Sequence, residues 1–127
     1  MTKEFVKYEQ ALALKELEFD EECFDYYNPI EHKLNIFGVV NSKLDFNKAW
    51  IPAPLYQQAF RWFRIQHGLY SAIVPKKSYP DNFVSGIEWY VEICGGDGIE
   101  IGPDGTYSYK EAESACLDKL IEICKNK

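Results

Sequence analysis

Short turns between strand-like segments restrict the fold of this chain more than any other feature of its sequence. Within residues 84–94, Trp89, Val91 and Ile93 alternate with polar neighbours, a period of two that is typical of a half-buried strand. Gly95-Gly96-Asp97-Gly98 follows, and residues 99–101 resume a strand-like pattern. A turn of this length cannot hold the crossover that parallel neighbours require, so the two strands are predicted to be antiparallel.

Three further segments are rich in the β-branched and aromatic residues that favour strands: 23–27, 33–40 and 69–74. A turn around Asn28–His32 is predicted to join the first two, because Asn-Pro is a turn-forming pair. The segment that holds Trp50, Pro52 and Pro54 is expected to be an extended loop.

Three segments show the spacing of amphipathic helices: 4–18, 54–67 and a last helix that starts at Ser108. Thr2 is predicted to cap the first helix, and Pro54 is predicted to open the second. Gly68 is expected to end the second helix in a left-handed conformation. Residues 108–111 (Ser-Tyr-Lys-Glu) match the capping box, which is the clearest helix start in the chain.

Apolar stripes mark the predicted buried faces of the first and last helices. The first stripe consists of Phe5, Tyr8, Leu12 and Leu17, with Ala11 and Leu14 beside them. The last stripe consists of Ala112, Ala115, Cys116, Leu120, Ile123 and Cys124. The predicted order is α-β-β-α-β-β-(β)-α over one domain, residues 1–127. We therefore expect an α+β fold, in which an antiparallel sheet of about four or five strands packs with three helices.

Aromatic residues make up 16% of the chain, more than a core of this size hides with ease. Trp, Tyr and Arg dominate binding hot spots, so the sequence predicts an interaction surface. Its candidate residues are Trp50, Tyr56, Arg61, Trp62, Arg64 and Trp89. In the alternative interpretation these rings build the core, and the arginines extend from its edge into solvent.

The net charge of −6 argues against nucleic acid as a partner, because affinity for phosphates comes from Lys and Arg. Residues 1–27 carry eight carboxylates and three lysines. No apolar run approaches the length of about 20 residues that a membrane span needs. The charged opening, Met1-Thr2-Lys3-Glu4, is unlike a signal peptide, so we expect a cytoplasmic protein with reduced thiols.

No residue is predicted to be catalytic, to bind a cofactor or to hold a metal. The glycine-rich segment 95–98 lacks the helix and the lysine of a phosphate-binding loop, which favours a hairpin turn. Cys23 stands beside an acidic cluster that disfavours its thiolate, and the cysteines lack the spacing of a zinc site. His67 is expected in the last turn of the second helix, where a cation is favourable, and His32 is expected in a turn.

Three segments resemble the helical signatures of a group of small uncharacterised proteins that phages and integrated mobile elements of gut anaerobic bacteria encode. They are residues 8–17 (YEQALALKEL), 54–64 (PLYQQAFRWFR) and 108–113 (SYKEAE). The resemblance implies a phage or prophage origin and the cytoplasm of a bacterial host. It implies no activity and no catalytic residues.

These observations favour a non-enzymatic accessory protein that binds a host or phage protein, or a second copy of itself, through aromatic residues. A second hypothesis is a small-molecule-binding or enzymatic domain with a pocket between sheet and helices. A third is an acidic inhibitor that occupies the basic site of a host nucleic-acid-binding protein.

Overall fold

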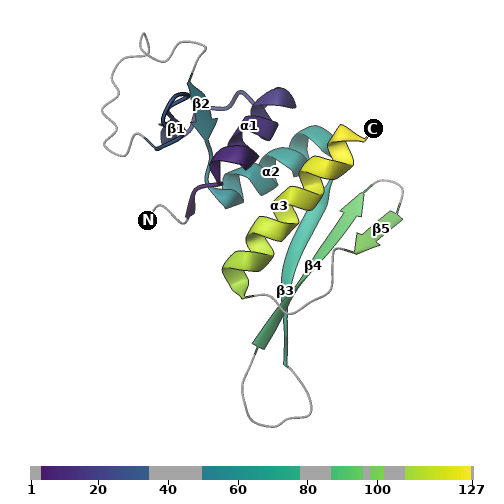
Figure 1. Cartoon of the computed structure of the whole chain (residues 1–127). Coiled ribbons are helices and arrows are strands. Elements are labelled where there is room, and N and C mark those ends of the chain that lie inside the picture. The colour runs from purple at the N-terminus through teal and green to yellow at the C-terminus, as the bar shows by residue number, and fades with distance from the viewer. Residues whose placement is uncertain (1–3, 35–49, 78–86, 96–97, 102–107, 127) are drawn as a thin grey trace. The chain divides into compact units, whose positions relative to one another are not determined.

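The computed structural model describes residues 4–34, 50–77, 87–95, 98–101 and 108–126 (Figure 1). The chain divides into two compact units, Met1–Ala59 and Phe60–Lys127, here the N-terminal unit and the C-terminal unit. The elements follow one another as α1, β1, β2, α2, β3, β4, β5 and α3. This order agrees with the predicted alternation, and the α+β class is confirmed. That the whole chain forms one domain stays a prediction.

The described strands form two antiparallel sheets, so the expectation of one sheet of about four or five strands is wrong. One sheet pairs β1 (Asp25–Tyr27) with β2 (Ile51–Ala53), and the other has the order β3-β4-β5. Pro52 in β2 and Pro75 in β3 have no backbone N–H, which confines both strands to sheet edges. Neither of these strands can therefore serve as the centre of a larger sheet.

The N-terminal unit is built from α1 (Tyr8–Glu16) and the sheet β1-β2, and α1 packs against β2. The chain before α1 pairs with the chain after β2. Phe5 forms a β-bridge with Leu55, and the N–H of Val6 donates to the carbonyl of Pro54 at 3.0 Å. The buried apolar residues of this unit include Val6, Ala11, Leu14, Phe19, Tyr27, Ile51 and Ala53.

Helix α1 is shorter than the predicted helix 4–18, because residues before it take part in the bridge to Leu55. Lys7 is the N-cap, and the predicted cap Thr2 lies outside the described residues. Phe5 therefore does not belong to the helical stripe, and Leu12 is 36% exposed. The buried face of α1 consists of Gln10, Ala11 and Leu14.

The predicted turn at Asn28–His32 is confirmed. The N–H of Asn28 donates to the carbonyl of Lys33 at 2.8 Å, and Leu34 then forms a β-bridge with Tyr27. The rest of the predicted strand 33–40 lies outside the described residues. The partner of β1 is β2, which comes from the segment that was expected to be a loop.

Helix α2 (Tyr56–His67) ends at the predicted residue, but the prediction that Pro54 opens it is wrong: the helix starts two residues later, because Leu55 forms the β-bridge with Phe5. Gly68 has a φ of +66°, which a residue without a Cβ adopts at little cost. The chain then turns back, and the N–H of Leu69 donates to the carbonyl of Phe63 at 3.1 Å. The predicted glycine cap is therefore confirmed.

The C-terminal unit holds the sheet of β3 (Tyr70–Lys77), β4 (Ile87–Gly95) and β5 (Gly98–Ile101). In this sheet β4 pairs with β3 on one side and with β5 on the other. Gly95 pairs with Gly98, as a hairpin requires, although residues 96–97 lie outside the described part. Helix α3 (Tyr109–Lys125) packs against β4 and β3 (Figure 1).

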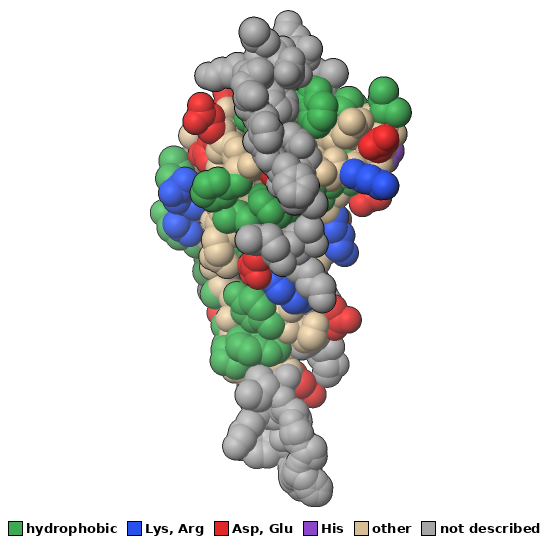
Figure 2. Space-filling model, turned by 90° about the vertical axis from the view of Figure 1, so that its left-hand side faces the viewer, with side chains coloured by type: hydrophobic (Ala, Val, Ile, Leu, Met, Phe, Trp, Pro, Cys, Tyr) green, Lys and Arg blue, Asp and Glu red, His purple; other side chains and the backbone are tan. Residues whose placement is uncertain are grey.

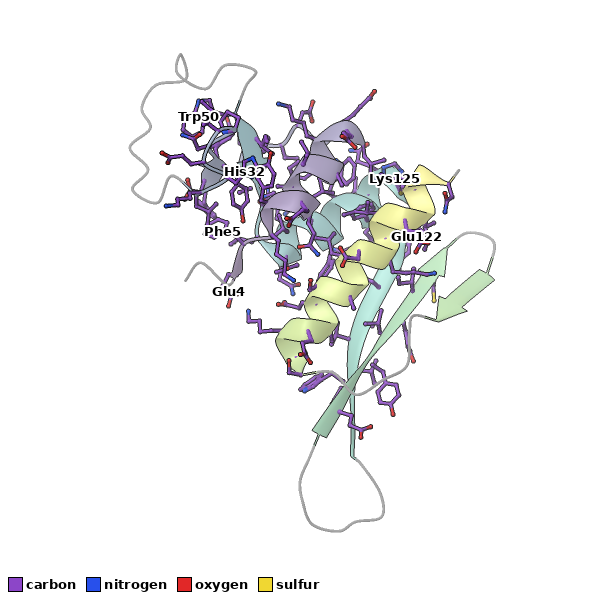
Figure 3. The ribbon with its side chains drawn as sticks, in the orientation of Figure 1. Glu4, Phe5, His32, Trp50, Glu122 and Lys125 are labelled. Atoms are coloured by element: carbon purple, nitrogen blue, oxygen red, sulfur yellow. The ribbon has the colours of Figure 1, made fainter. Side chains whose placement is uncertain are left out.

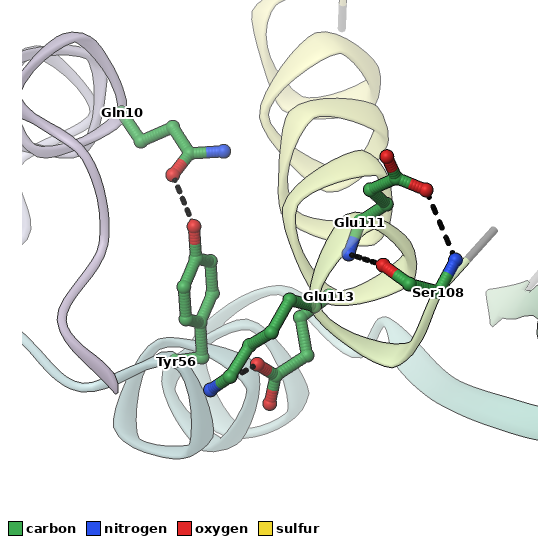
Figure 4. Close-up of polar contacts among 6 residues, drawn as sticks. Gln10, Tyr56, Ser108, Glu111 and Glu113 are labelled. Atoms are coloured by element: carbon green, nitrogen blue, oxygen red, sulfur yellow. Dashed lines mark hydrogen bonds and ion pairs between the residues drawn. The ribbon is translucent and has the colours of Figure 1, made fainter. Parts of the chain in front are cut away.

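The buried face of α3 is wider than the predicted stripe, because the helix packs against two strands. It consists of Ala112, Glu113, Cys116, Leu117, Leu120, Ile121 and Cys124. Ala115 and Ile123 of the predicted stripe are half-buried. The buried carboxylate of Glu113 lies 3.4 Å from the Nζ of Lys110 (Figure 4).

The predicted capping box of α3 is confirmed (Figure 4). The N–H of Glu111 donates to the Oγ of Ser108 at 3.2 Å, and the N–H of Ser108 donates to the Oε1 of Glu111 at 3.0 Å. The box satisfies two backbone N–H groups that the helix itself leaves unpaired. Both residues are exposed, so water competes for the same groups.

Replacing Ser108 with alanine is expected to lower the free energy of unfolding by about 1 kcal/mol, because the first turn of α3 loses its side-chain acceptor. Urea denaturation followed by circular dichroism measures this change. Ser108→Asp is the matched control, because aspartate also accepts from the N3 amide. Equal stability of the alanine and aspartate variants would contradict the capping role.

Candidate functional site

One face of the β3-β4-β5 sheet is covered by α3. Val91 and Ile93 of β4 are buried, and the ring of Trp89 lies 5.0 Å from that of Tyr109 in α3, at 82°. On β3, the Ser71 side chain forms a hydrogen bond with the thiol of Cys116 in α3. The alternation predicted for β4 is therefore confirmed: its odd-numbered residues from 89 to 93 face the helix.

The opposite face of this sheet, here the open sheet face, is not covered by α3. The register places Tyr70 opposite Cys94, Ala72 opposite Glu92 and Val74 opposite Tyr90. Tyr70 is 56% exposed, and the other side chains are exposed or half-buried. The described side chains of the open sheet face are Tyr70, Ala72, Val74, Glu88, Tyr90, Glu92 and Cys94.

The composition of the open sheet face is unusual for a face that meets water. Antiparallel sheets with one solvated face usually carry polar residues there. Here Tyr70, Ala72, Val74 and Tyr90 bring aromatic and aliphatic groups to the surface within two adjacent strands. Contiguous apolar surface of this kind is typical of interaction sites.

The charged groups described on the open sheet face are carboxylates, both on β4. Glu88 accepts a hydrogen bond from the hydroxyl of Tyr90 at 3.2 Å. Glu92 is exposed, and its register neighbours are Ala72 in β3 and Ile101 in β5. This carboxylate therefore stands on the central strand with apolar residue types on either side.

The six residues predicted for an interaction surface do not form one surface within either unit. Tyr56 and Trp62 are buried, as the alternative interpretation expected of core rings. The hydroxyl of Tyr56 donates to the Oε1 of buried Gln10 at 2.9 Å (Figure 4). Trp50, labelled in Figure 3, belongs to the N-terminal unit. Its carbonyl accepts a hydrogen bond from the Nζ of Lys15 at 3.3 Å.

The other three predicted residues belong to the C-terminal unit. Trp89 is half-buried on the covered face of the sheet. Arg61 and Arg64 are exposed on α2, and Ile65 beside them is 65% exposed. An interaction surface that includes both arginines stays a prediction.

Sequence reasoning missed the residues of β3 that complete the open sheet face. The alternation along β4 places Tyr90 and Glu92 on the side away from the core, and this placement is confirmed. The apolar contribution of Tyr70, Ala72 and Val74 depends on the pairing of β3 with β4. A hairpin register assigned to residues 70–95 would have shown it, because opposite residues share a face.

The cysteine environments disfavour nucleophilic chemistry at the buried positions. Burial raises the pKa of the Cys23 thiol to about 12, and the charge of Glu21 adds to this effect. The expected disfavoured thiolate is confirmed, with burial as the larger cause. Burial also raises the pKa of Cys116 to about 11, against a lowering by the hydrogen bond with Ser71. Cys94, on the open sheet face, is exposed.

Alkylation of the native protein with iodoacetamide at pH 8 is expected to modify Cys94 before Cys23, Cys116 and Cys124. Only about one part in 10⁴ of a thiol with a pKa of 12 is ionised at this pH, and the thiolate is the nucleophile. Peptide mass spectrometry over time measures the order, and the unfolded protein is the control in which all four react. Early modification of half-buried Cys23 would contradict the raised pKa of its thiol.

The two histidines contact aromatic rings. His32, with a φ of 59°, stacks on Tyr8 at a centroid distance of 3.8 Å and an angle of 9°. His67 lies in the last turn of α2, as predicted, with its ring 4.9 Å from that of Trp62. Its favourable interaction with the helix dipole stays a prediction.

Exposed acidic residues follow one another along the end of α1 and the loop after it: Glu16, Glu18, Asp20 and Glu22. Phe24, just beyond them, is 80% exposed. Asp25 is buried, and its Oδ1 accepts from the N–H of Tyr26 at 2.8 Å. The acidic surface that the third hypothesis requires therefore does not include Asp25. The inhibitory role of that surface stays a prediction.

Within the described ranges, no three or more His, Cys, Asp or Glu side chains gather in a group that could hold a metal ion. None of the helices described here is both long and apolar enough to span a membrane.

On the face shown in Figure 2, acidic and basic side chains of the described residues are interspersed, with hydrophobic side chains between them.

No family model, curated protein or solved structure matches this chain.

Proposed function

We propose that this chain is a non-enzymatic protein-binding module and that the open sheet face is its binding surface. The observation that carries the proposal is the position of exposed Tyr70 and Ala72 and half-buried Val74 and Tyr90 on one side of a sheet whose other side is covered by α3. Burying such groups against a partner removes apolar surface from water, which is the main favourable term in protein association. Tyr is also enriched among the residues that dominate binding energy.

The packing of the C-terminal unit favours this proposal over a domain with an internal pocket. In that unit α3 packs directly on β4, and Ala112, Cys116 and Leu120 of its inner face are buried. Val91 and Ile93 are buried on the strand side. Side chains therefore occupy the layer in which the second hypothesis places a ligand.

We further propose that the module is an accessory protein of a phage or mobile element and acts in the cytoplasm of a bacterial host. This part rests on the resemblance of residues 8–17, 54–64 and 108–113 to phage and mobile-element proteins. The net charge of −6 supports a protein as the partner in preference to nucleic acid.

Photo-crosslinking tests the proposed surface. Benzoylphenylalanine replaces Tyr90, and the variant is expressed in bacterial cells and irradiated. The expected result is a covalent adduct between this chain and a protein, because Tyr90 lies within the open sheet face.

The control places the same probe at Glu122, on an exposed part of α3 (Figure 3). Adducts at position 90 but not at position 122 support the proposal. Absence of a protein adduct at position 90, or equal yields at the two positions, contradicts it.

A further inference from the structure

The position of Glu92 sets a chemical requirement on whatever covers the open sheet face. Its carboxylate is exposed in the free chain, on the central strand, between register neighbours Ala72 and Ile101. A partner that packs on the surrounding apolar groups removes water from this carboxylate. Burial of an unpaired charge is strongly unfavourable, so the partner must supply a cation within an apolar surface.

A surface of this chemistry is present on the same chain. On α2, Arg61, Arg64 and Ile65 are exposed, and residues three and four apart lie on one side of a helix. Ile65 supplies an aliphatic group, and Arg64 supplies a guanidinium that can bind a carboxylate through two hydrogen bonds. These three residues are here the α2 stripe.

Helix packing on this sheet is already seen on its other side. There α3 packs against β4 and β3 through the stripe that includes Ala112 and Cys116. The open sheet face presents the same two strands to a helix from outside.

We infer that the open sheet face binds the α2 stripe of a second copy of this chain, with Arg64 of one copy opposite Glu92 of the other. The inference rests on the proposed function and names its partner. Two open sheet faces packed together would bring the Glu92 carboxylates into one apolar interface. Two α2 stripes packed together would likewise gather the arginines. Among the side chains that the structure describes on these two surfaces, the pairing of face with stripe is the one that places the Glu92 carboxylate opposite the Arg64 guanidinium.

Charge exchange tests this inference. Sedimentation equilibrium at increasing protein concentration is expected to show association of the unaltered chain, and high salt is expected to weaken it. Glu92→Arg and Arg64→Glu are each expected to weaken association at least about tenfold, because each variant opposes like charges. Both positions are exposed, and circular dichroism checks that each variant is folded.

The two single variants mixed in equal amounts provide the decisive measurement. The arginine introduced at position 92 of one variant then meets the glutamate introduced at position 64 of the other. The original pair forms at the second contact, so association is expected to return. The double variant is expected to associate as well. Glu122→Arg, at an exposed carboxylate of α3, is the matched control and is expected to leave association unchanged.

A chain that stays monomeric at all concentrations, or a mixture that does not recover, overturns the inference. The proposed function fails separately. If the chain is monomeric but the probe at position 90 forms an adduct with a different protein, the face binds a partner and only its identity was wrong. If neither association nor an adduct is found, both proposals fail.

Discussion

Replacing Leu14 with alanine is expected to lower the free energy of unfolding of the N-terminal unit by about 2–5 kcal/mol. Leu14 lies on the buried face of α1 and is fully inaccessible to solvent, at 0% exposure. Its truncation removes apolar contacts and leaves a cavity that close-packed neighbours fill only in part. Urea denaturation followed by circular dichroism measures the change.

Leu12→Ala in the same helix is the matched control. Leu12 is 36% exposed, so the same truncation is expected to cost less than about 1 kcal/mol. The two variants share the change in helix propensity, and their difference therefore reports burial alone. Equal effects would show that α1 does not present Leu14 to the core.

A charge introduced at adjacent residues of β4 is expected to lower the stability of the C-terminal unit by very different amounts. Val91→Lys should destabilise the C-terminal unit by at least about 3 kcal/mol, because Val91 is 1% exposed on the face that α3 covers. Tyr90→Lys should change stability by no more than about 1 kcal/mol. Its side chain stays on the open sheet face, between Glu88 and Glu92 of the same strand.

Thermal unfolding followed by circular dichroism compares the two lysine variants. The comparison tests the register directly, because a shift by one residue would exchange the two faces of the strand. A stable Val91→Lys variant together with an unfolded Tyr90→Lys variant would mean that α3 covers the opposite face.

Local sequence signals predicted the end of α2 and the start of α3 correctly. The side chains of Ser108 and Glu111 act within one turn of α3, and the backbone freedom of Gly68 acts at the end of α2. Neither signal depends on a distant residue, so both can be interpreted from the local sequence. The alternation along β4 likewise indicated which residues face the core, because the period of a strand is a local property.

Predictions that depend on distant pairing were less accurate. The start of α1 is set by the bridge between Phe5 and Leu55, residues fifty positions apart, and a helical pattern in residues 4–18 cannot show it. The division into two sheets depends on β1 pairing with β2, whose three residues include a proline. Propensity alone assigned that segment to a loop.

The candidate site shows the same limit. The Trp, Tyr and Arg content suggested a surface, but Tyr56 and Trp62 are buried. The open sheet face instead depends on Tyr70 and Val74 lying on the same side of the sheet as Tyr90, which is a consequence of the β3-β4 register. Composition gives the number of rings, whereas their exposure is decided by tertiary packing.

Pro75 has a consequence for how copies of this chain can meet. It lies in edge strand β3, opposite Trp89, and offers no donor to a ladder on either side. A strand from another molecule that extended along β3 past this point would lose a hydrogen bond, which hinders the open-ended stacking that builds amyloid fibrils. Contacts through side chains on the two faces of the sheet do not use this hydrogen-bond ladder, so Pro75 does not interrupt them.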